Sequence, residues 1–200
     1  MDELKVQRDA WGFLAAVFNT LPDASLVQGL RATLPNAAAD DSDSGQAAAS
    51  SPAAAWMEGL SDAQALEALG KDRARLFRHV DEFCIDPPYE SIYVGKSENA
   101  VLQELHRFFL EAGFTTTGLC KEPIDYLGME LAFLAESCER ELAAAQAEQP
   151  EEAARLAGLR EEFLADHVQP WVPAYARQMQ AAAETGFYRE VATQLLAILG

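Results

Sequence analysis

The side chains with the strongest catalytic and metal-binding chemistry in this sequence are scattered rather than grouped. None of the histidines has a second histidine or a cysteine at metal-ligand spacing, and the cysteines form no Cys-x-x-Cys pair. The sequence has neither a serine nucleophile elbow nor a helical His-Glu-x-x-His motif. We therefore expect no catalytic activity, no metal and no other cofactor. The residues concerned are His79, His106, His167, Cys84, Cys120 and Cys138.

Two partial motifs point to phosphate and calcium binding, and both lack an essential residue. Gly95, Lys96 and Ser97 resemble the end of a phosphate-binding loop, but that loop needs a glycine at position 90, where Glu90 would repel phosphate. The acidic segment 41–45 resembles a calcium loop, but Pro52 takes the place of its bidentate glutamate. A nucleotide-binding helical protein stays one alternative function, and a generic helical scaffold for protein interactions is another.

The composition limits the classes of partner. The chain has 200 residues, of which half are hydrophobic, and its 15 Lys and Arg against 32 Asp and Glu give a net charge of −17. These values are typical of a globular protein. The negative charge argues against nucleic acid or an anionic membrane surface as partner, although a basic partner fits it. No stretch approaches about 20 apolar residues, so we expect no membrane insertion.

The apolar stretch 11–18 resembles the centre of a secretory signal peptide, but its flanks do not. Asp2, Glu3 and Asp9 replace the basic start of such a peptide, and no small-residue cleavage site follows before Pro22. An odd number of cysteines is also not a disulfide framework. We expect a helix of the mature protein here and a cytoplasmic location.

Apolar residues at helical spacing predict helices through the first half of the chain, interrupted by one segment. A helix over 2–20 ends before Pro22, and a short helix ends at Pro35. Segment 35–53 has no large apolar residue and is expected to be a flexible acidic insert. Helix is expected again from Trp56 until Gly70 breaks it, and a further helix carries Leu76, Phe77, Val80 and Phe83.

The second half begins with an ordered loop over 84–98, which contains two prolines and a glycine. A helix over 99–112 follows, with Gly113 as its left-handed cap. Pro123 suits the first turn of a long helix, Pro150 opens another, and two more helices follow Pro173 and Gly186. The fold class is therefore all-α, a single domain over 1–200 with roughly eight to ten helices and the insert at 35–53.

Three motifs in the second half occur in a familiar order. The first is Arg75-Leu76-Phe77 followed by the segment PPYESIY at 87–93, and the second is KEPIDYLGMELAFL at 121–134. The third is Phe163-Leu164 with His167, Trp171 and Tyr175 downstream. Together they resemble the TorD/DmsD family of redox-enzyme maturation chaperones, and they cover about residues 72–175. Tyr126 stands where the family pattern has a histidine.

The resemblance implies an all-helical cytoplasmic chaperone without catalytic turnover. Its partners would be the twin-arginine signal peptide and the apo form of a molybdoenzyme catalytic subunit, which it would hold until cofactor insertion. The chaperone itself would be a monomer or a homodimer. A receptor for such a peptide needs carboxylates for the two arginines and an apolar groove for the segment that follows. The candidate residues are Asp125, Glu122, Tyr126, Glu90, Tyr89, Tyr93, Leu76, Phe77, Met129 and Phe133.

Structural explanations for the same residues stay open. Pro123 and Asp125 would also start a helix well, because proline suits its first position and an acid suits its first turn. Met129 and Phe133 would equally be core residues. The acidic run 122–166 would also be an ordinary solvated surface.

Overall fold

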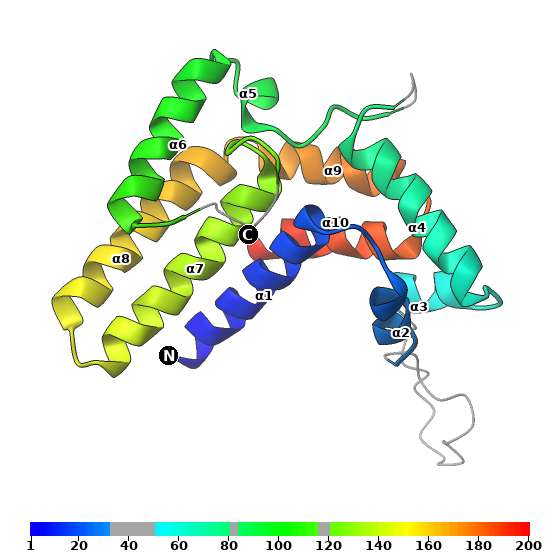
Figure 1. Cartoon of the computed structure of the whole chain (residues 1–200), viewed down its shortest axis with the longest axis horizontal. Helices are drawn as coiled ribbons and strands as arrows, with labels where there is room; N and C mark the ends of the chain where they lie inside the picture. The colour runs from blue at the N-terminus through cyan, green and yellow to red at the C-terminus, as the bar shows by residue number, and fades with distance from the viewer. Residues whose placement is uncertain (33–50, 81–83, 116–120) are drawn as a thin grey trace. The chain divides into compact units, whose positions relative to one another are not determined.

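A computed structural model of the chain describes residues 1–32, 51–80, 84–115 and 121–200. Within these ranges it contains ten α-helices, one short π-helix and no strand, which confirms the all-α fold class (Figure 1). The helices are α1 (Asp2–Asn19), α2 (Ala24–Ala32), α3 (Pro52–Met57), α4 (Asp62–Phe77), α5 (Glu90–Tyr93), α6 (Glu98–Ala112), α7 (Leu127–Gln146), α8 (Pro150–Phe163), the π-helix η1 (Leu164–Val168), α9 (Val172–Ala182) and α10 (Gly186–Ile198).

The contacts within the chain divide it into two compact units. Unit 1 comprises Met1–Leu21, Pro87–Tyr175 and Leu199, and unit 2 comprises Pro22–Asp86, Ala176–Ile198 and Gly200. Each unit therefore collects segments that are distant in sequence. A single domain over 1–200 stays a prediction.

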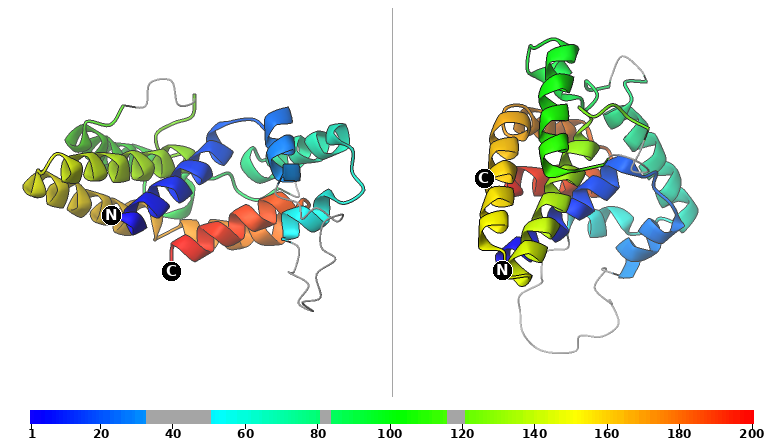
Figure 2. Two further views of the ribbon diagram at one scale, coloured as in Figure 1. Left: turned by 90° about the horizontal axis from the view of Figure 1, so that it is seen from below. Right: turned by 60° about the vertical axis from the view of Figure 1, so that its left-hand side comes forward.

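Unit 1 is built around α7, which lies alongside both α1 and α8 (Figures 1 and 2). The apolar face of α7 is buried from Leu127 to Leu142, and Trp11, Leu14 and Phe18 form the buried face of α1. Four phenylalanine rings fill the space where α6, α7 and α8 meet. They are Phe108, Phe109, Phe133 and Phe163, with neighbouring ring centroids 4.2–6.2 Å apart.

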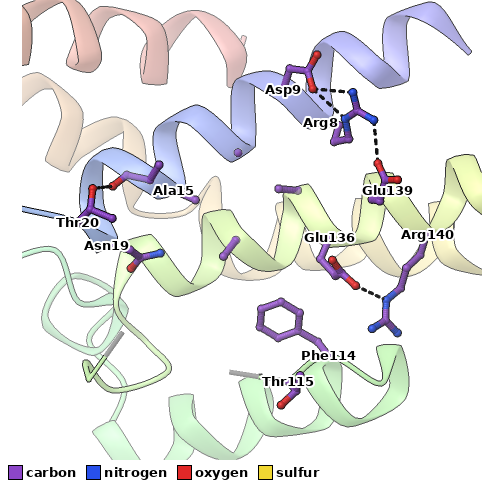
Figure 3. Close-up of a pocket in the computed structure, with 14 residues that line it drawn as sticks. Arg8, Asp9, Ala15, Asn19, Thr20, Phe114, Thr115, Glu136, Glu139 and Arg140 are labelled. Carbon is purple, nitrogen blue, oxygen red and sulfur yellow. Dashed lines mark hydrogen bonds and ion pairs between the residues drawn. The ribbon is translucent and has the colours of Figure 1, made fainter. Parts of the chain in front are cut away.

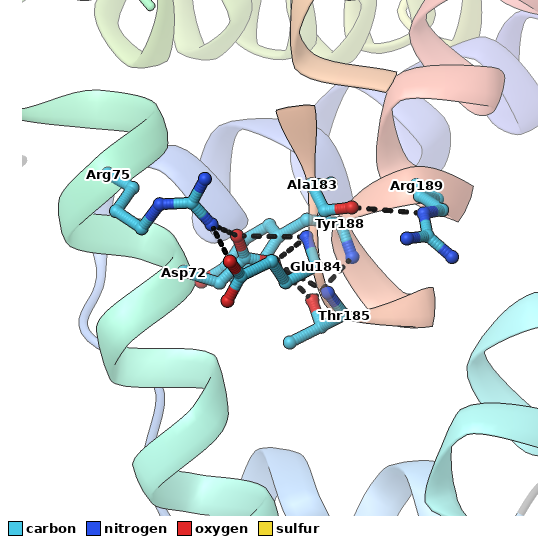
Figure 4. A network of polar contacts seen from close by, with 7 residues as sticks. All are labelled: Asp72, Arg75, Ala183, Glu184, Thr185, Tyr188 and Arg189. Atoms are coloured by element: carbon cyan, nitrogen blue, oxygen red, sulfur yellow. Dashed lines mark hydrogen bonds and ion pairs between the residues drawn. The ribbon is translucent and has the colours of Figure 1, made fainter. Parts of the chain in front are cut away.

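Unit 2 packs α3 against α10 and α2 against α3 and α4. Gly186 allows α10 to approach α3, because a Cβ atom there would overlap the carbonyl oxygen of Pro52. The side chain of Asp72, fully buried on α4, accepts hydrogen bonds at the start of α10 (Figure 4). Its carboxylate takes the backbone N–H groups of Glu184 and Thr185 and the Thr185 hydroxyl, at 2.8–3.1 Å.

The expected helix break at Gly70 is wrong. Gly70 lies inside α4 and is exposed, and a helix of this length tolerates one interior glycine at a cost of about 0.5–1 kcal/mol. The break comes earlier, where Gly59 has a positive φ of 77° and Ser61 forms a capping box with Gln64. Leu76 and Phe77 therefore end α4 rather than belonging to a further helix.

The expected starts and ends of two other elements also differ. The long helix begins at Leu127 rather than at Pro123, because Tyr126 has an extended backbone that pairs with Tyr89. The first helix was expected over 2–20 and ends at Asn19, and Leu21 beyond it is 74% exposed. The helical and capping predictions for 99–112 and Gly113 are confirmed, with Gly113 in the left-handed region.

The proposed insert at 35–53 falls largely outside the described residues, as do Phe83 and Cys120. Its end is described and differs from the expectation. Pro52 and Ala53 begin α3, because the Ser51 side chain accepts the Ala54 N–H and proline suits the first helical position. None of the helices in the described ranges has the length and apolar character needed to cross a lipid bilayer.

Candidate functional site

Two of the three sequence motifs meet in unit 1 through main-chain hydrogen bonds. Residues 87–93, here called the strap, run beside residues 122–127. The Glu90 N–H donates to the Asp125 carbonyl and the Leu127 N–H donates to the Pro88 carbonyl, both at 2.9 Å. Tyr89 and Tyr126 form the antiparallel bridge between the two segments. The backbone of one motif therefore fixes the position of the other.

Side chains add two further links between the strap and this turn. The Ser91 hydroxyl donates to Asp125 Oδ2 at 2.6 Å, and the Tyr89 hydroxyl donates to Glu122 Oε2 at 2.7 Å. Asp125 is 2% exposed, whereas Glu122 and Tyr89 are only partly buried. Glu122 and Tyr89 are therefore partly accessible to solvent, whereas Asp125 is buried.

The third motif reaches the strap through a buried acid–base pair. His167, on the π-helix, places Nδ1 at 3.0 Å from Glu90 Oε2 and 3.1 Å from Glu90 Oε1. Both residues are 1% exposed. The Trp171 indole donates to the His167 carbonyl at 2.6 Å, and its ring stacks on Tyr93 at 5.2 Å. The 87–93 part of the first motif thus meets the other two motifs in one place, defined here as the signature site: residues 87–93, 122–131 and 167–175.

The π-helix was not expected from the sequence. It widens the turn after α8 by one residue, and His167 is one of its two buried residues. The sequence predicts no ligand or catalytic partner for His167, and its pairing with Glu90 depends on a contact across 77 positions. The only sequence signal for this pairing was the family resemblance, because Glu90 and His167 belong to two of the motifs that carry it.

Glu130 is the second functional candidate that residue patterns missed. It occupies the first turn of α7 and is 0% exposed. Its carboxyl group interacts with the side chains of Glu90 and Trp171. The sequence shows that Glu130 belongs to the Glu-Leu pair at 130–131 of the second motif. It does not show that the Glu130 side chain is buried.

The electrostatics of the site favour protonated acids. Burial raises the pKa of Glu130 well above its ordinary value, and the negative charges of Glu90 and Asp125 raise it further, while the Trp171 side chain opposes the shift. Burial also raises the pKa of Glu90, and the hydrogen bond and charge of His167 act in the opposite direction. Glu90, Asp125 and Glu130 are therefore one electrostatically linked group, called the acid cluster below.

The remaining predicted residues have packing roles. Tyr126 is 1% exposed, and its hydroxyl donates to the Phe18 carbonyl of α1 at 2.9 Å. Met129 and Phe133 are buried on α7. Leu76 and Phe77 belong to unit 2, where Phe77 contacts the Tyr188 ring. The structure therefore places eight of the ten predicted residues in unit 1 and two in unit 2.

A surface groove lies elsewhere in unit 1, between α1 and α7 (Figure 3). It has a volume of about 760 Å³. Its sides carry two ion-paired clusters, Arg8 with Asp9 and Glu139, and Arg140 with Glu136. None of the predicted site residues lines it. The lining residues are Arg8, Asp9, Gly12, Ala15, Ala16, Asn19, Thr20, Phe114, Thr115, Ala132, Ala135, Glu136, Glu139 and Arg140.

The phosphate-loop remnant at 95–97 has structural contacts in place of a nucleotide site. Lys96 Nζ lies 2.7 Å from Glu104 Oε2, and the Ser97 side chain caps α6 by accepting the Ala100 N–H. Gly95 has a φ of 67°, which suits the turn before that cap. Among the described residues no group of three or more His, Cys, Asp or Glu side chains is arranged to hold a metal ion.

Comparison with known proteins points to one family. Residues 38–177, more than half of the chain, match the family model described as nitrate reductase delta subunit. The chain is 31% identical over 132 residues to a protein named chaperone protein TorD from Vibrio parahaemolyticus, and 29% identical over 113 residues to one of the same name from Photobacterium profundum.

These matches cover part of each protein. The Vibrio alignment covers 64% of this chain and 60% of its relative, and the Photobacterium alignment covers 55% and 51%. The chain therefore spans about half to three fifths of the curated relatives it matches. No solved structure gives a significant match.

Proposed function

Because the chain belongs to the nitrate reductase delta subunit family, which includes the TorD/DmsD chaperones, we propose that it is a maturation chaperone for a redox enzyme with a twin-arginine signal peptide. The chaperone binds the signal peptide of a molybdenum-cofactor oxidoreductase subunit in the cytoplasm. It holds the apo form of that subunit until the cofactor is inserted, and then releases it for export. It is a binding protein without catalytic turnover.

The observation that supports this function best is the meeting of segments from all three family motifs at the signature site. Motifs that served only to form separate helices would not need to share contacts. Here they share main-chain hydrogen bonds, a buried Glu90–His167 pair and stacked aromatic rings. The site offers carboxylates beside aromatic surface, which is the chemistry that an arginine pair followed by apolar residues requires.

The expected affinity follows from a small number of contacts. A charge-assisted hydrogen bond contributes about 1.5–3 kcal/mol, and burying one large apolar side chain contributes a similar amount. After the costs of ordering the peptide and of association, a few such contacts give a dissociation constant on the order of micromolar. This affinity suits a chaperone that must later release its client.

Calorimetric titration with a synthetic signal peptide tests the proposal. The peptide carries two adjacent arginines followed by an apolar stretch, and a matched peptide has both arginines replaced by alanine. We expect the first to bind with micromolar affinity and the second at least about tenfold more weakly. Equal affinity for the two peptides, or no binding of either, would contradict the proposed function.

A further inference from the structure

The groove between α1 and α7 has a floor of small residues (Figure 3). Gly12 and Ala16 contribute to it from α1, and Ala132 and Ala135 contribute from α7, each pair at a spacing that shares one helix face. A Cβ atom added at Gly12 would meet no atom of a neighbouring element within 4 Å. All of the lining residues belong to unit 1. A further element could therefore pack closely on this floor without any rearrangement between the two units.

The floor also restricts the conformation of whatever binds there. The main-chain groups of α1 and α7 are used within their own helices, and the polar side chains at one end, Asn19 and Thr20, already donate to the Gly128 and Ala16 carbonyls. An extended segment would bury its own N–H and C=O groups against alanine methyl groups, where they would have no partners. An α-helix satisfies these groups internally, so the groove suits a helix.

The length of the groove sets the length of that helix. The lining residues extend along α1 from Arg8 to Thr20, which at 1.5 Å per residue is about 18 Å, or roughly three helical turns. The Phe114 ring, held against Phe109 and Phe133 at centroid distances of 4.8 and 5.4 Å, lines the groove together with Thr115. The groove thus offers an apolar floor and one aromatic ring to a helix of about 12 residues.

The charged residues of the groove favour a basic occupant. Arg8 lies between Asp9 and Glu139, at 2.8 Å from each, and Arg140 lies 2.8 Å from Glu136. The acids are the more exposed members: the side chains of Asp9 and Glu139 are 69% and 56% exposed, against 34% for Arg8. Three carboxylates against two guanidinium groups leave a negative rim on a chain of net charge −17. Lysine or arginine side chains beside this rim would be electrostatically complementary.

We propose that the groove between α1 and α7 is a docking site for a basic amphipathic α-helix of a partner protein. Apolar side chains of leucine size fill the floor, and basic side chains along the borders of that apolar face pair with Asp9, Glu136 and Glu139. Among the helices in the described ranges only α2 and α9 have more basic than acidic residues, each with one arginine and no acid. A second copy of this chain therefore lacks the helix that the groove suits.

This inference does not rest on the proposed function. None of the residues that line the groove belongs to the signature site, so the two surfaces are separate. The same helix could be supplied by any partner that carries basic residues around a leucine face. What the inference adds is a second interaction surface in unit 1 and the chemistry of the segment that it binds.

A designed peptide serves as the probe. It has about 14 residues, a leucine face, lysines along both borders of that face, and a side-chain staple on the opposite face, because isolated helices of this length are marginal in water. One matched peptide has its lysines replaced by glutamate. The other keeps the composition but distributes the leucines around the helix. Fluorescence anisotropy measures the affinity of each labelled peptide for the full chain.

We expect a micromolar dissociation constant for the basic amphipathic peptide and at least about tenfold weaker binding of both matched peptides. Equal binding of the peptide with distributed leucines would show attraction by charge alone and would overturn the inference. Equal binding of the glutamate peptide would also overturn it, because the rim would then have no part in recognition.

Filling the groove locates the binding. Ala135 is partly exposed, so the ring of Ala135→Phe can project into the groove without entering the core, whereas Ala154→Phe places the same ring on an exposed position of α8. We expect about tenfold weaker probe binding for Ala135→Phe and wild-type binding within about twofold for Ala154→Phe. Circular dichroism verifies folding. Ala16→Phe, from the exposed side of α1, repeats the test if Ala135→Phe does not fold. Wild-type affinity in a folded groove variant would place the probe elsewhere and overturn the inference.

Competition with the signal peptide separates this inference from the proposed function. We expect a saturating concentration of the unlabelled arginine peptide to leave probe affinity unchanged, and Ala135→Phe to bind the signal peptide as wild type does. Displacement of the probe, together with weaker signal-peptide binding by Ala135→Phe, would make the groove the signal-peptide site and overturn the separate surface. Probe binding without signal-peptide binding would leave the groove standing and contradict the proposed function, and the reverse result would do the opposite.

Discussion

At the scale of single residues, Glu130 links the pH of the solution to the stability of the fold. Its pKa is higher in the folded protein than in the unfolded chain, so the folded protein binds a proton that the unfolded chain has released. Stability therefore falls as pH rises from the ordinary range of a glutamic acid toward the raised value. Glu90 contributes in the same direction, since burial raises its pKa as well.

Glu130→Gln should remove the contribution of Glu130 to that slope. We expect the variant to be more stable than wild type by about 1–3 kcal/mol at pH 8, with a difference that shrinks toward pH 5, because glutamine cannot ionise. Urea denaturation followed by circular dichroism at a series of pH values measures this. Parallel curves for the two proteins would mean that the pKa of Glu130 is the same in the folded and the unfolded chain.

Asp125 is expected to act on the client peptide rather than on helix formation. The structure places it before α7, in a turn, so the helix-start explanation no longer accounts for it. Asp125→Asn keeps an oxygen for the Ser91 hydroxyl but removes the charge, and should weaken peptide binding by about 1–3 kcal/mol. In a double-mutant cycle, the arginine-free peptide should bind both proteins equally. An equal loss for both peptides would show a merely structural role.

Asp72 shows the opposite case, a buried acid whose partners explain it completely. Asp72→Ala would leave two backbone N–H groups and a hydroxyl unsatisfied at the start of α10, and should reduce the free energy of unfolding by about 2–4 kcal/mol. Asp62→Ala, which breaks an exposed ion pair with Arg31, is the matched control and should cost at most about 1 kcal/mol. Equal losses would contradict the capping role of Asp72.

At the scale of secondary-structure elements, local patterns predicted the helices well and their ends unevenly. Gly113 ends α6 as expected, because a left-handed glycine cap acts locally, and the Ser97 side chain caps the other end. The start of α7 depends on Tyr89, which pairs with Tyr126 from a distant segment. The π-helix η1 likewise contains a residue with a distant partner, since His167 pairs with Glu90. Periodicity within a window of residues contains no information about such distant partners.

The same limit applies to the candidate site. Motif order placed Glu90, Asp125 and Tyr89 together correctly, because the family resemblance carries tertiary information that residue chemistry does not. Burial was not predicted for Asp125, since an acid beside a proline is most often an exposed helix start. Glu130 was part of a recognised motif, but only the structure shows that its carboxyl group is fully buried.

The packing of α3 on α10 depends on the absence of a side chain at Gly186. Gly186→Ala would bring a methyl group onto the Pro52 carbonyl and the Trp56 side chain, and should destabilise unit 2 by about 1–3 kcal/mol or more. Gly158→Ala on α8 is the control: it faces open space and should stabilise by about 0.5–1 kcal/mol. Thermal denaturation of both variants checks the pair, and a neutral Gly186→Ala would show that α3 moves away easily.

At the scale of the whole molecule, the net charge of −17 acts on any basic client before contact. A peptide with two arginines is attracted from a distance, and this attraction raises the association rate more than it lowers the dissociation rate. The contacts inside the acid cluster are buried and therefore less screened by salt than those at the surface. The two stages of recognition should thus differ in their response to ionic strength.

Stopped-flow measurement of peptide binding between about 20 and 500 mM salt separates these stages. The Debye length falls from roughly 20 Å to about 4 Å over this range, so the association rate for the arginine peptide should fall several-fold. The dissociation rate should change much less, because it depends on contacts that are buried in the complex. The arginine-free peptide, which lacks that charge, should associate at nearly the same rate throughout. A dissociation rate that rises as steeply as the association rate falls would show that the arginines stay at the surface, in contact with Glu122 rather than with Asp125.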